Sequence, residues 1–133
     1  DENGFPQTRV MDNLRSKERY PKLANLFKTH EDCFWILLTT NTSSNKVKHI
    51  KKNPAVSAYY CKPREFHAAM FSGMGEISED SELKKTVWNE SWTQYYPKGV
   101  TDPDYTVLSL DPVYARGWAG ETANFKFSLK TKR

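Results

Sequence analysis

The chain has 133 residues, of which 38% are hydrophobic and 14% aromatic, and its net charge is +4. This length fits one domain, which we expect to span residues 1–133 and to fold without disulfides or a metal. The sequence has no apolar run long enough to cross a membrane, no signal-peptide pattern, and only two cysteines, which form no disulfide framework. We therefore expect a cytoplasmic protein with two free thiols and no membrane contact.

The first half of the chain predicts two strands and one clear helix. Asn3-Gly4 is typical of a turn between two strands, so residues 5–14 are expected to be the second strand of a hairpin. We expect the first strand of the domain, with or without a helix, to be missing from this sequence. CFWILLTT (33–40) predicts a buried strand, and NKVKHIKK (45–52) predicts a short amphipathic helix that Asn53-Pro54 ends.

The second half predicts more strands and one further helix. Residues 66–77 form a long predicted strand, in which Gly73 and Gly75 indicate a bulge or a close backbone approach. A helix is expected over 79–92. Further strands are expected at residues 55–60, 105–110, 113–118 and 124–129. About six strands with two or three short helices predict a mainly β protein, a β-barrel with peripheral helices.

The segment TTNTSSNKVK (39–48) is the first candidate functional site. A strand end, small polar residues and a helix start place hydroxyl groups and free backbone N–H groups at one point, which favours an anion. Lys46 lies in the first helical turn, where a cation opposes the helix dipole unless an anion is present. A capped surface helix with solvated lysines explains the same pattern equally well.

Arg9 is the second candidate, within QTRVMDN (7–13). If this segment is a strand, Arg9, Met11 and Asn13 share one face. A guanidinium suits bidentate contacts to phosphate, so Arg9 could reach the same anion. The alternative is an arginine at the barrel rim that pairs with a carboxylate.

Other polar and aromatic residues give weaker signals. The three histidines lack the spacing of metal ligands, so no metal site is expected. Neither cysteine has a neighbouring histidine in the sequence that would make it a nucleophile. Trp88 and Trp92, four residues apart, are typical of a packed core, whereas Trp118 either lines a pocket or packs in an ordinary way.

Together these segments resemble the pyridoxamine 5′-phosphate oxidase-like flavin-binding split barrels and, among them, the small general-stress-protein branch. The most specific element is the T-N-x-x-S-x-K stretch that leads into a basic helix ending in N-P-x-V. The resemblance is carried by DENGFPQTRVMDN, LLTTNTSSNKVKHIKKNPAVSAYY, FSGMGEIS, WNESWTQYYPKGVTDPDYTVLSLDP and GWAG.

The resemblance implies a split β-barrel homodimer with flavin mononucleotide (FMN) at the dimer interface. Arg9 and Lys46 would contact the phosphate, with Ser44 and Asn45 completing its cradle. The other implied flavin contacts are Met11, Asp12, Thr39 and Thr40, with Trp118 reaching the flavin from the partner subunit. The same cradle would fit a deazaflavin.

The chain also departs from the true oxidases of this family. Asn45 stands where they have an arginine, and Ala68 stands at about the position of their glutamine near the flavin ring. Their C-terminal substrate-gripping motif has no counterpart in residues 121–133, so oxidation of pyridoxine phosphate is not expected.

Three functions follow from the sequence. The first is a flavin-dependent oxidoreductase that acts on an unidentified small molecule, with the cofactor supplying the chemistry. The second is a flavin-binding stress protein that buffers or senses the cofactor without turnover. The third is a basic nucleic-acid-binding barrel, which is less favoured because it requires exposed aromatic side chains for base stacking.

Overall fold

A computed structural model describes residues 3–120 and 123–129 of the chain. The strands are β1 (Ile36–Asn41), β2 (Ala55–Lys62), β3 (His67–Ser78), β4 (Tyr105–Ala119) and β5 (Ala123–Ser128). The α-helices are α1 (Ala24–Lys28), α2 (Asn45–Lys52) and α3 (Ser81–Val87), and the 3-10 helices are η1 (Pro21–Leu23), η2 (Pro63–Glu65), η3 (Glu90–Gln94) and η4 (Gly99–Thr101). No helix in the described part of the chain is long and apolar enough to cross a membrane.

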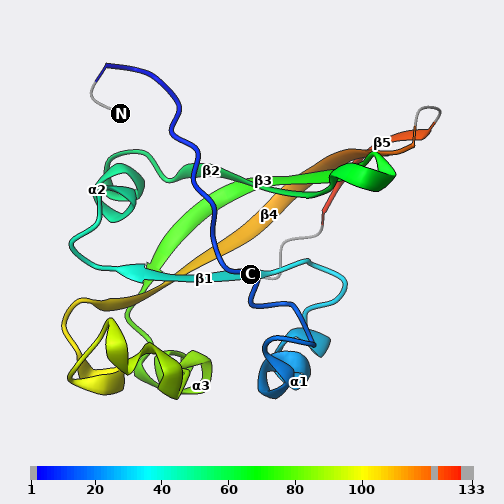
Figure 1. Cartoon of the computed structure of the whole chain (residues 1–133). Helices are drawn as coiled ribbons and strands as arrows, with labels where there is room; N and C mark the ends of the chain where they lie inside the picture. The colour runs from blue at the N-terminus through cyan, green and yellow to red at the C-terminus, as the bar shows by residue number, and fades with distance from the viewer. Residues whose placement is uncertain (1–2, 121–122, 130–133) are drawn as a thin grey trace.

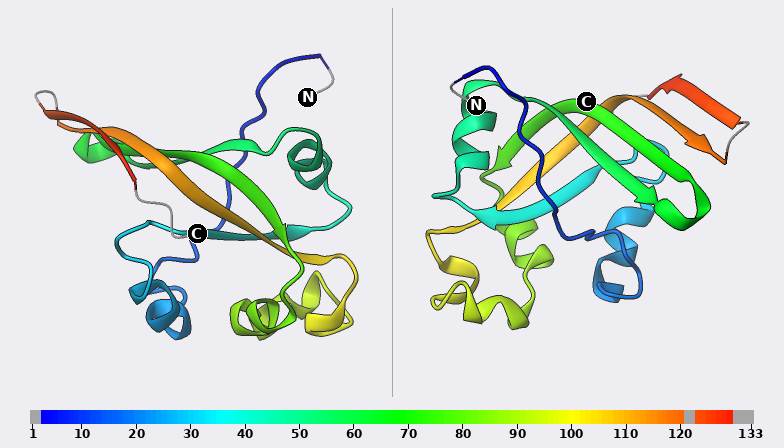
Figure 2. Two further views of the ribbon diagram at one scale, coloured as in Figure 1. Left: turned by 180° about the vertical axis from the view of Figure 1, so that it is seen from behind. Right: turned by 45° about the horizontal axis from the view of Figure 1, so that its top comes forward.

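The five strands form one antiparallel sheet in the order β1-β4-β3-β2, with β5 also paired to β4. β4 is the longest strand: β3 pairs along one of its edges, while β1 and β5 pair with the two halves of the other edge. The sheet is strongly twisted and curled, as Figures 1 and 2 show, so that it forms an open half-barrel. This confirms the predicted mainly β, split-barrel class.

One face of the sheet, which we call the helical face, is covered by α1, α3 and η3 (Figure 1). Strand alternation places Leu37, Tyr105 and Val107 on this face. Their side chains belong to an aromatic cluster in which Trp88 packs edge-on against Trp92 and Tyr105, with ring centroids 6.0 and 5.0 Å apart. The prediction that Trp88 and Trp92 belong to the core is confirmed.

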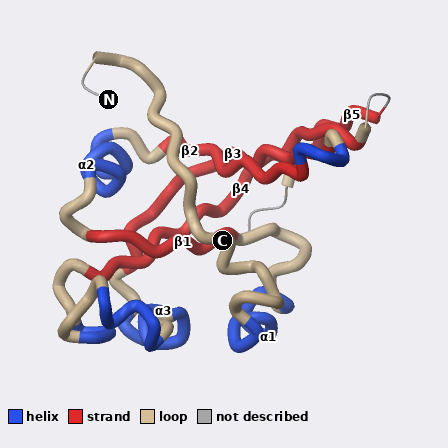
Figure 3. Tube along the Cα trace, viewed as in Figure 1, coloured by secondary structure: helices blue, strands red, loops and turns tan. Residues whose placement is uncertain are grey.

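The opposite face, which we call the barrel face, carries the alternate residues of the same strands. Leu38 pairs with Leu108, and Thr40 pairs with Thr106. The short helix α2 packs on this side and buries Val47, whereas α1 and α3 lie across the sheet from it (Figures 1 and 3). The predicted bounds of this helix, 45–52, are confirmed, and its last turn is followed by Asn53-Pro54.

The glycine prediction in β3 is also confirmed. The pairing of β3 with β4 shifts register between Ser72 and Gly73. A Cβ atom at Gly73 would overlap the carbonyl oxygen of Asp111, and a Cβ at Gly75 would lie 3.0 Å from the side chain of Val56. The bulge therefore depends on a residue that has no side chain.

Three predicted elements differ from the structure. Residues 5–14 are not a strand: Asn3 and Gly4 form a turn, but the following segment pairs with no strand, and Val10 is 100% exposed. The predicted strands at 105–110 and 113–118 are one strand, β4, because Pro112 sits at the bulge instead of ending the strand. The predicted helix over 79–92 ends at Val87 and is followed by η3. Asp1 and Glu2 lie outside the described residues.

Candidate functional site

The end of β1, the turn that follows it and the start of α2 form a small polar site. Thr40 is only 6% exposed, and its hydroxyl lies 3.5 Å from the hydroxyl of Ser44, the residue that caps α2. The cap makes no side-chain hydrogen bond to the first helical turn. Because the first N–H groups of a helix have no partner within the helix, donors remain here for an external acceptor.

Lys46 and Arg9 bring two positive charges to this helix start. Burial lowers the pKa of Lys46, and the charge of Arg9 lowers it further. Neither cation pairs with a carboxylate within residues 3–120 and 123–129. Two neighbouring cations beside unused helix N–H groups repel one another, and a bound anion would relieve that repulsion.

The turn between β1 and α2 is held by one carboxylate from a distant part of the chain. Asp104, which precedes β4, accepts hydrogen bonds from the Asn41 amide nitrogen at 2.6 Å and from the Ser43 backbone N–H at 2.8 Å. These bonds lower the pKa of Asp104. Asp104 belongs to the DPDY segment of the family resemblance, but no role was predicted for it; only the tertiary contact reveals one.

The remaining predicted flavin contacts lie in different surroundings. Thr39, next to Thr40, is half-buried on β1 and pairs with Val107, while Asn45 is exposed in the first turn of α2. Met11 is half-buried on the unpaired N-terminal segment. Of the predicted set, Thr40, Ser44, Asn45 and Lys46 therefore lie together at the start of α2, whereas Thr39 shares the helical face with Val107.

Asp12, also predicted to contact the flavin, has partners within the chain. One carboxylate oxygen accepts from Arg19 at 2.6 Å, and the other accepts from the Tyr20 hydroxyl at 3.0 Å. Burial and this hydrogen bond raise the pKa of Tyr20. The role of Asp12 toward a flavin remains a prediction.

Trp118 lies at the other end of β4 from this site. Thr106 is the β4 partner of Thr40, and Trp118 follows 12 residues later, which is about 40 Å along the strand. Trp118 lines an open hollow of about 490 Å³ and faces Tyr59, with ring centroids 6.1 Å apart. Within one chain, the structure does not bring Trp118 to the predicted phosphate site.

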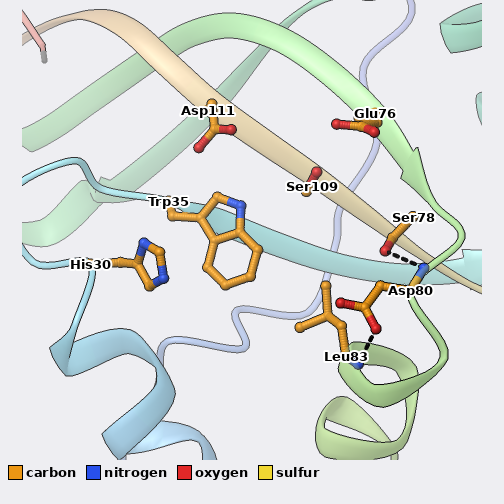
Figure 4. Close-up of a pocket in the computed structure, with 8 residues that line it drawn as sticks. All are labelled: His30, Trp35, Glu76, Ser78, Asp80, Leu83, Ser109 and Asp111. Atoms are coloured by element: carbon orange, nitrogen blue, oxygen red, sulfur yellow. Dashed lines mark hydrogen bonds between the residues drawn. The ribbon is translucent and has the colours of Figure 1, made fainter. Parts of the chain in front are cut away.

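A second cavity, of about 300 Å³, lies on the helical face between the loop after α1 and the start of α3 (Figure 4). The carboxylates of Glu76, Asp80 and Asp111 line it, together with His30 and Trp35. Asp80 also caps α3 by accepting backbone N–H bonds. Its three carboxylates make this cavity unsuited to a phosphate.

One sequence-based expectation about cysteine is wrong. The sulfur of Cys33 lies 3.5 Å from Nδ1 of His30, so this cysteine does have a histidine neighbour. The spacing of three residues was visible in the sequence, but the turn that joins them, with Phe34 in the left-handed region, was not. Cys33 is 3% exposed, whereas Cys61 is exposed, and both are free thiols.

The curled antiparallel sheet, with a helical layer on one face and a polar helix start at its rim, defines the class of split β-barrel proteins. The sequence comparison is more specific: residues 23–133 match the model of the pyridoxamine 5′-phosphate oxidase like family. The chain belongs to this family. Comparison with curated proteins finds no match.

Solved structures with the same fold include several general stress proteins. A Clostridium acetobutylicum protein related to general stress protein 26 of B. subtilis has a TM-score of 0.73 and 29% identity, over 96% of this chain and 79% of that one. General stress protein 26 from Bacillus anthracis has a TM-score of 0.60 and 24% identity, over 72% and 70%. The general stress FMN/FAD binding protein from Xanthomonas citri has a TM-score of 0.56 and 21% identity, over 74% and 68%.

Proposed function

We propose that this chain binds flavin mononucleotide and acts as a flavin-dependent oxidoreductase on a small molecule. The observation that carries the proposal is the pair of cations, Lys46 and Arg9, at the start of α2 without a carboxylate partner in the described residues. Family membership supports a flavin as the ligand, and one protein of the same fold is named as FMN/FAD binding.

The residues of the site fit the phosphate end of this cofactor. Lys46 and Arg9 supply charge, the first turn of α2 supplies backbone donors, and the hydroxyls of Thr40 and Ser44 supply further donors. Asn45 replaces the arginine of the true oxidases, so the site holds one cation fewer. The bound flavin supplies hydride or electron transfer, and the chain binds and orients it.

A flavin-binding protein without turnover is the alternative within the same class. Of the predicted flavin contacts, Asp12 is the only carboxylate, and both of its oxygens already accept hydrogen bonds from Arg19 and Tyr20. Among these predicted contacts, therefore, no carboxylate without a hydrogen-bond partner in the protein is available as a general acid or base. Turnover would therefore depend on the flavin and on the substrate's own groups.

The first experiment is a titration of the purified chain with FMN and with riboflavin, which lacks the phosphate. We expect FMN to bind more tightly than riboflavin, because only FMN engages Lys46 and Arg9. Protein that binds neither compound would overturn the proposal. Anaerobic reduction of the bound flavin, followed by candidate acceptors, then tests turnover; no acceptor faster than dissolved oxygen would favour the non-catalytic alternative.

We further propose that the protein is a homodimer in which Trp118 approaches the flavin bound by the partner subunit. Trp118 lies far from the phosphate site along β4, so it would reach a flavin only in a second subunit. The neighbouring Tyr59 is 55% exposed, so an aromatic surface is available for a second copy. Light scattering should give the mass of a dimer, and a monomer at working concentration would remove the proposed role of Trp118.

The two free thiols, Cys33 and Cys61, fit a protein of the reducing cytoplasm.

A further inference from the structure

Asp104 connects the turn after β1 to a loop more than 60 residues later in the sequence. Its carboxylate accepts from the Asn41 side chain at 2.6 Å, from the Ser43 N–H at 2.8 Å and from the Ser43 hydroxyl at 3.2 Å. Its backbone carbonyl accepts from the Thr42 N–H at 2.7 Å. One residue thus satisfies donors from three successive residues of this turn, which we call the 41–43 turn.

Asp104 is itself fixed to the core. Asp102, only 8% exposed, accepts from the Asp104 N–H at 3.0 Å and from the Lys98 N–H at 3.1 Å. The carbonyl of Asp102 also accepts from the N–H of Tyr105, whose side chain is fully buried in the aromatic cluster. The position of the Asp104 carboxylate is therefore set by packed residues.

The 41–43 turn determines where the first turn of α2 begins. The Ser44 N–H donates to the Asn41 carbonyl at 3.0 Å, and the Val47 N–H donates to the Ser44 carbonyl at 3.1 Å. Asp104 uses the donors of Asn41 and Ser43, so these groups are not left to the anion. What remains directed outward is the start of α2, with Lys46 in its first turn.

We propose that Asp104 is a positioning residue of the phosphate site: it fixes the 41–43 turn so that Ser44 and the start of α2 hold the phosphate. This inference rests on the proposed function. Asp104 carries a negative charge, so repulsion of the phosphate and positioning of the turn would change the affinity for FMN in opposite directions. A carboxylate that merely repelled phosphate would weaken FMN binding, and its removal would tighten it; a positioning carboxylate strengthens FMN binding.

The test is the substitution Asp104→Asn, which keeps the shape of the side chain and removes its charge. We expect the affinity for FMN to fall about tenfold, the order expected for losing one charge-assisted hydrogen bond, with riboflavin affinity unchanged. The matched control is Asp111→Asn, which removes the same charge from an exposed carboxylate on β4 outside the site. We expect this control to change neither affinity.

A second readout needs no ligand. In the free protein, hydrogen exchange at the Ser43 amide should be faster in Asp104→Asn than in the wild type. The neutral amide oxygen is a weaker acceptor for this N–H than the carboxylate, and the new amide nitrogen cannot accept from the Asn41 side chain. Equal or tighter FMN binding by Asp104→Asn, or equal losses for FMN and riboflavin, would overturn the inference alone. Wild-type protein that binds neither compound would overturn the proposed function together with it.

Discussion

The guanidinium of Arg9 lies close enough to the ammonium group of Lys46 to lower the pKa of that lysine. The two residues are far apart in the sequence, and Arg9 belongs to a segment with no strand pairing. Like charges that meet in a folded protein cost free energy unless a counter-ion is present. This relationship makes the start of α2 a place where an anion would stabilise the protein.

Replacing Lys46 with alanine should weaken FMN binding by about 1–3 kcal/mol, the contribution of a charge-assisted hydrogen bond. The titration should show no comparable change for riboflavin. Lys48→Ala is the matched control, because Lys48 is an exposed lysine on the same helix. Equal losses in the two variants would mean that the net charge of α2, and not a contact by Lys46, governs affinity.

Replacing Arg9 with alanine should also weaken FMN binding, by about 1 kcal/mol, since its side chain is exposed and its contact is more screened by solvent. In the absence of flavin the same variant should raise the pKa of Lys46, because one of the two causes that lower it is removed. NMR titration of the lysine side chain measures this shift. An unchanged pKa of Lys46 would show that the two charges do not meet in solution.

The bulge between β3 and β4 predicts a difference between two glycines of β3. Gly73→Ala should destabilise the fold by about 1–3 kcal/mol, because the new methyl group meets the backbone of Asp111 and Pro112. Gly75→Ala should cost less, since the nearest atom belongs to the Val56 side chain, which can move. Denaturant unfolding compares them, and a larger loss for Gly75→Ala would contradict the register of the β3–β4 pair.

Asp104 predicts a pH dependence of stability. Hydrogen bonds from Asn41 and Ser43 lower its pKa in the folded state. Burial raises the pKa of the nearby Tyr96, and the charges of Asp104 and Asp102 raise it further. The contribution of a carboxylate with a lowered pKa is complete above its ordinary pKa, and it is lost as the pH falls through the lowered value.

The stability difference between the wild type and Asp104→Asn should therefore shrink as the pH falls below the ordinary pKa of aspartate. Thermal unfolding from neutral to acidic pH measures it, with Asp111→Asn as the control for loss of a charge alone. A difference that stays constant over this range would mean that the Asp104 carboxylate has the same pKa in the folded and unfolded states.

The two cysteines should react differently with a thiol reagent. Cys61 is exposed and should react in the native protein, whereas Cys33 is buried beside His30 and should react only after unfolding. The native protein should thus release one equivalent in a disulfide-exchange assay, and Cys61→Ser should release none. Rapid reaction of native Cys61→Ser would show that the turn around Cys33 opens in solution.

The sequence was sufficient for the elements whose signals are local. The bounds of α2 follow from lysines around Val47 and Ile50 and from the stop at Asn53-Pro54. The bulge could be predicted from Gly73, because a glycine within a strand often marks a bulge or a close approach of another backbone. The polar segment from Thr40 to Lys46 could also be predicted, because a strand end followed by small polar residues and a helix start is a local pattern.

Other features depend on contacts between distant residues. The Asn3-Gly4 turn predicted a hairpin strand over residues 5–14, but a strand needs a neighbouring strand to pair with, and this segment pairs with no strand of the described structure. The sequence predicted two strands, at 105–110 and 113–118, but the register shift at Pro112 lets them continue as one strand, β4. The hydrogen bond from the Ser43 N–H to the Asp104 carboxylate joins residues 61 positions apart, and no local sequence pattern predicts it. The polar site could therefore be predicted from the sequence, but the hydrogen bonds from Asp104 that hold its turn could not.

β4 carries residues of two different surroundings on one uninterrupted strand: Thr106 at the rim near α2, and Trp118 beside Tyr59. In the proposed dimer, the Thr106 end of β4 would lie near the flavin bound by the same protomer, and the Trp118 end would lie near the flavin bound by the partner subunit. The number of residues in β4 would then set the spacing between the two cofactors. In that dimer, an insertion of two residues into β4 would keep every side chain on its face while moving the two flavins apart.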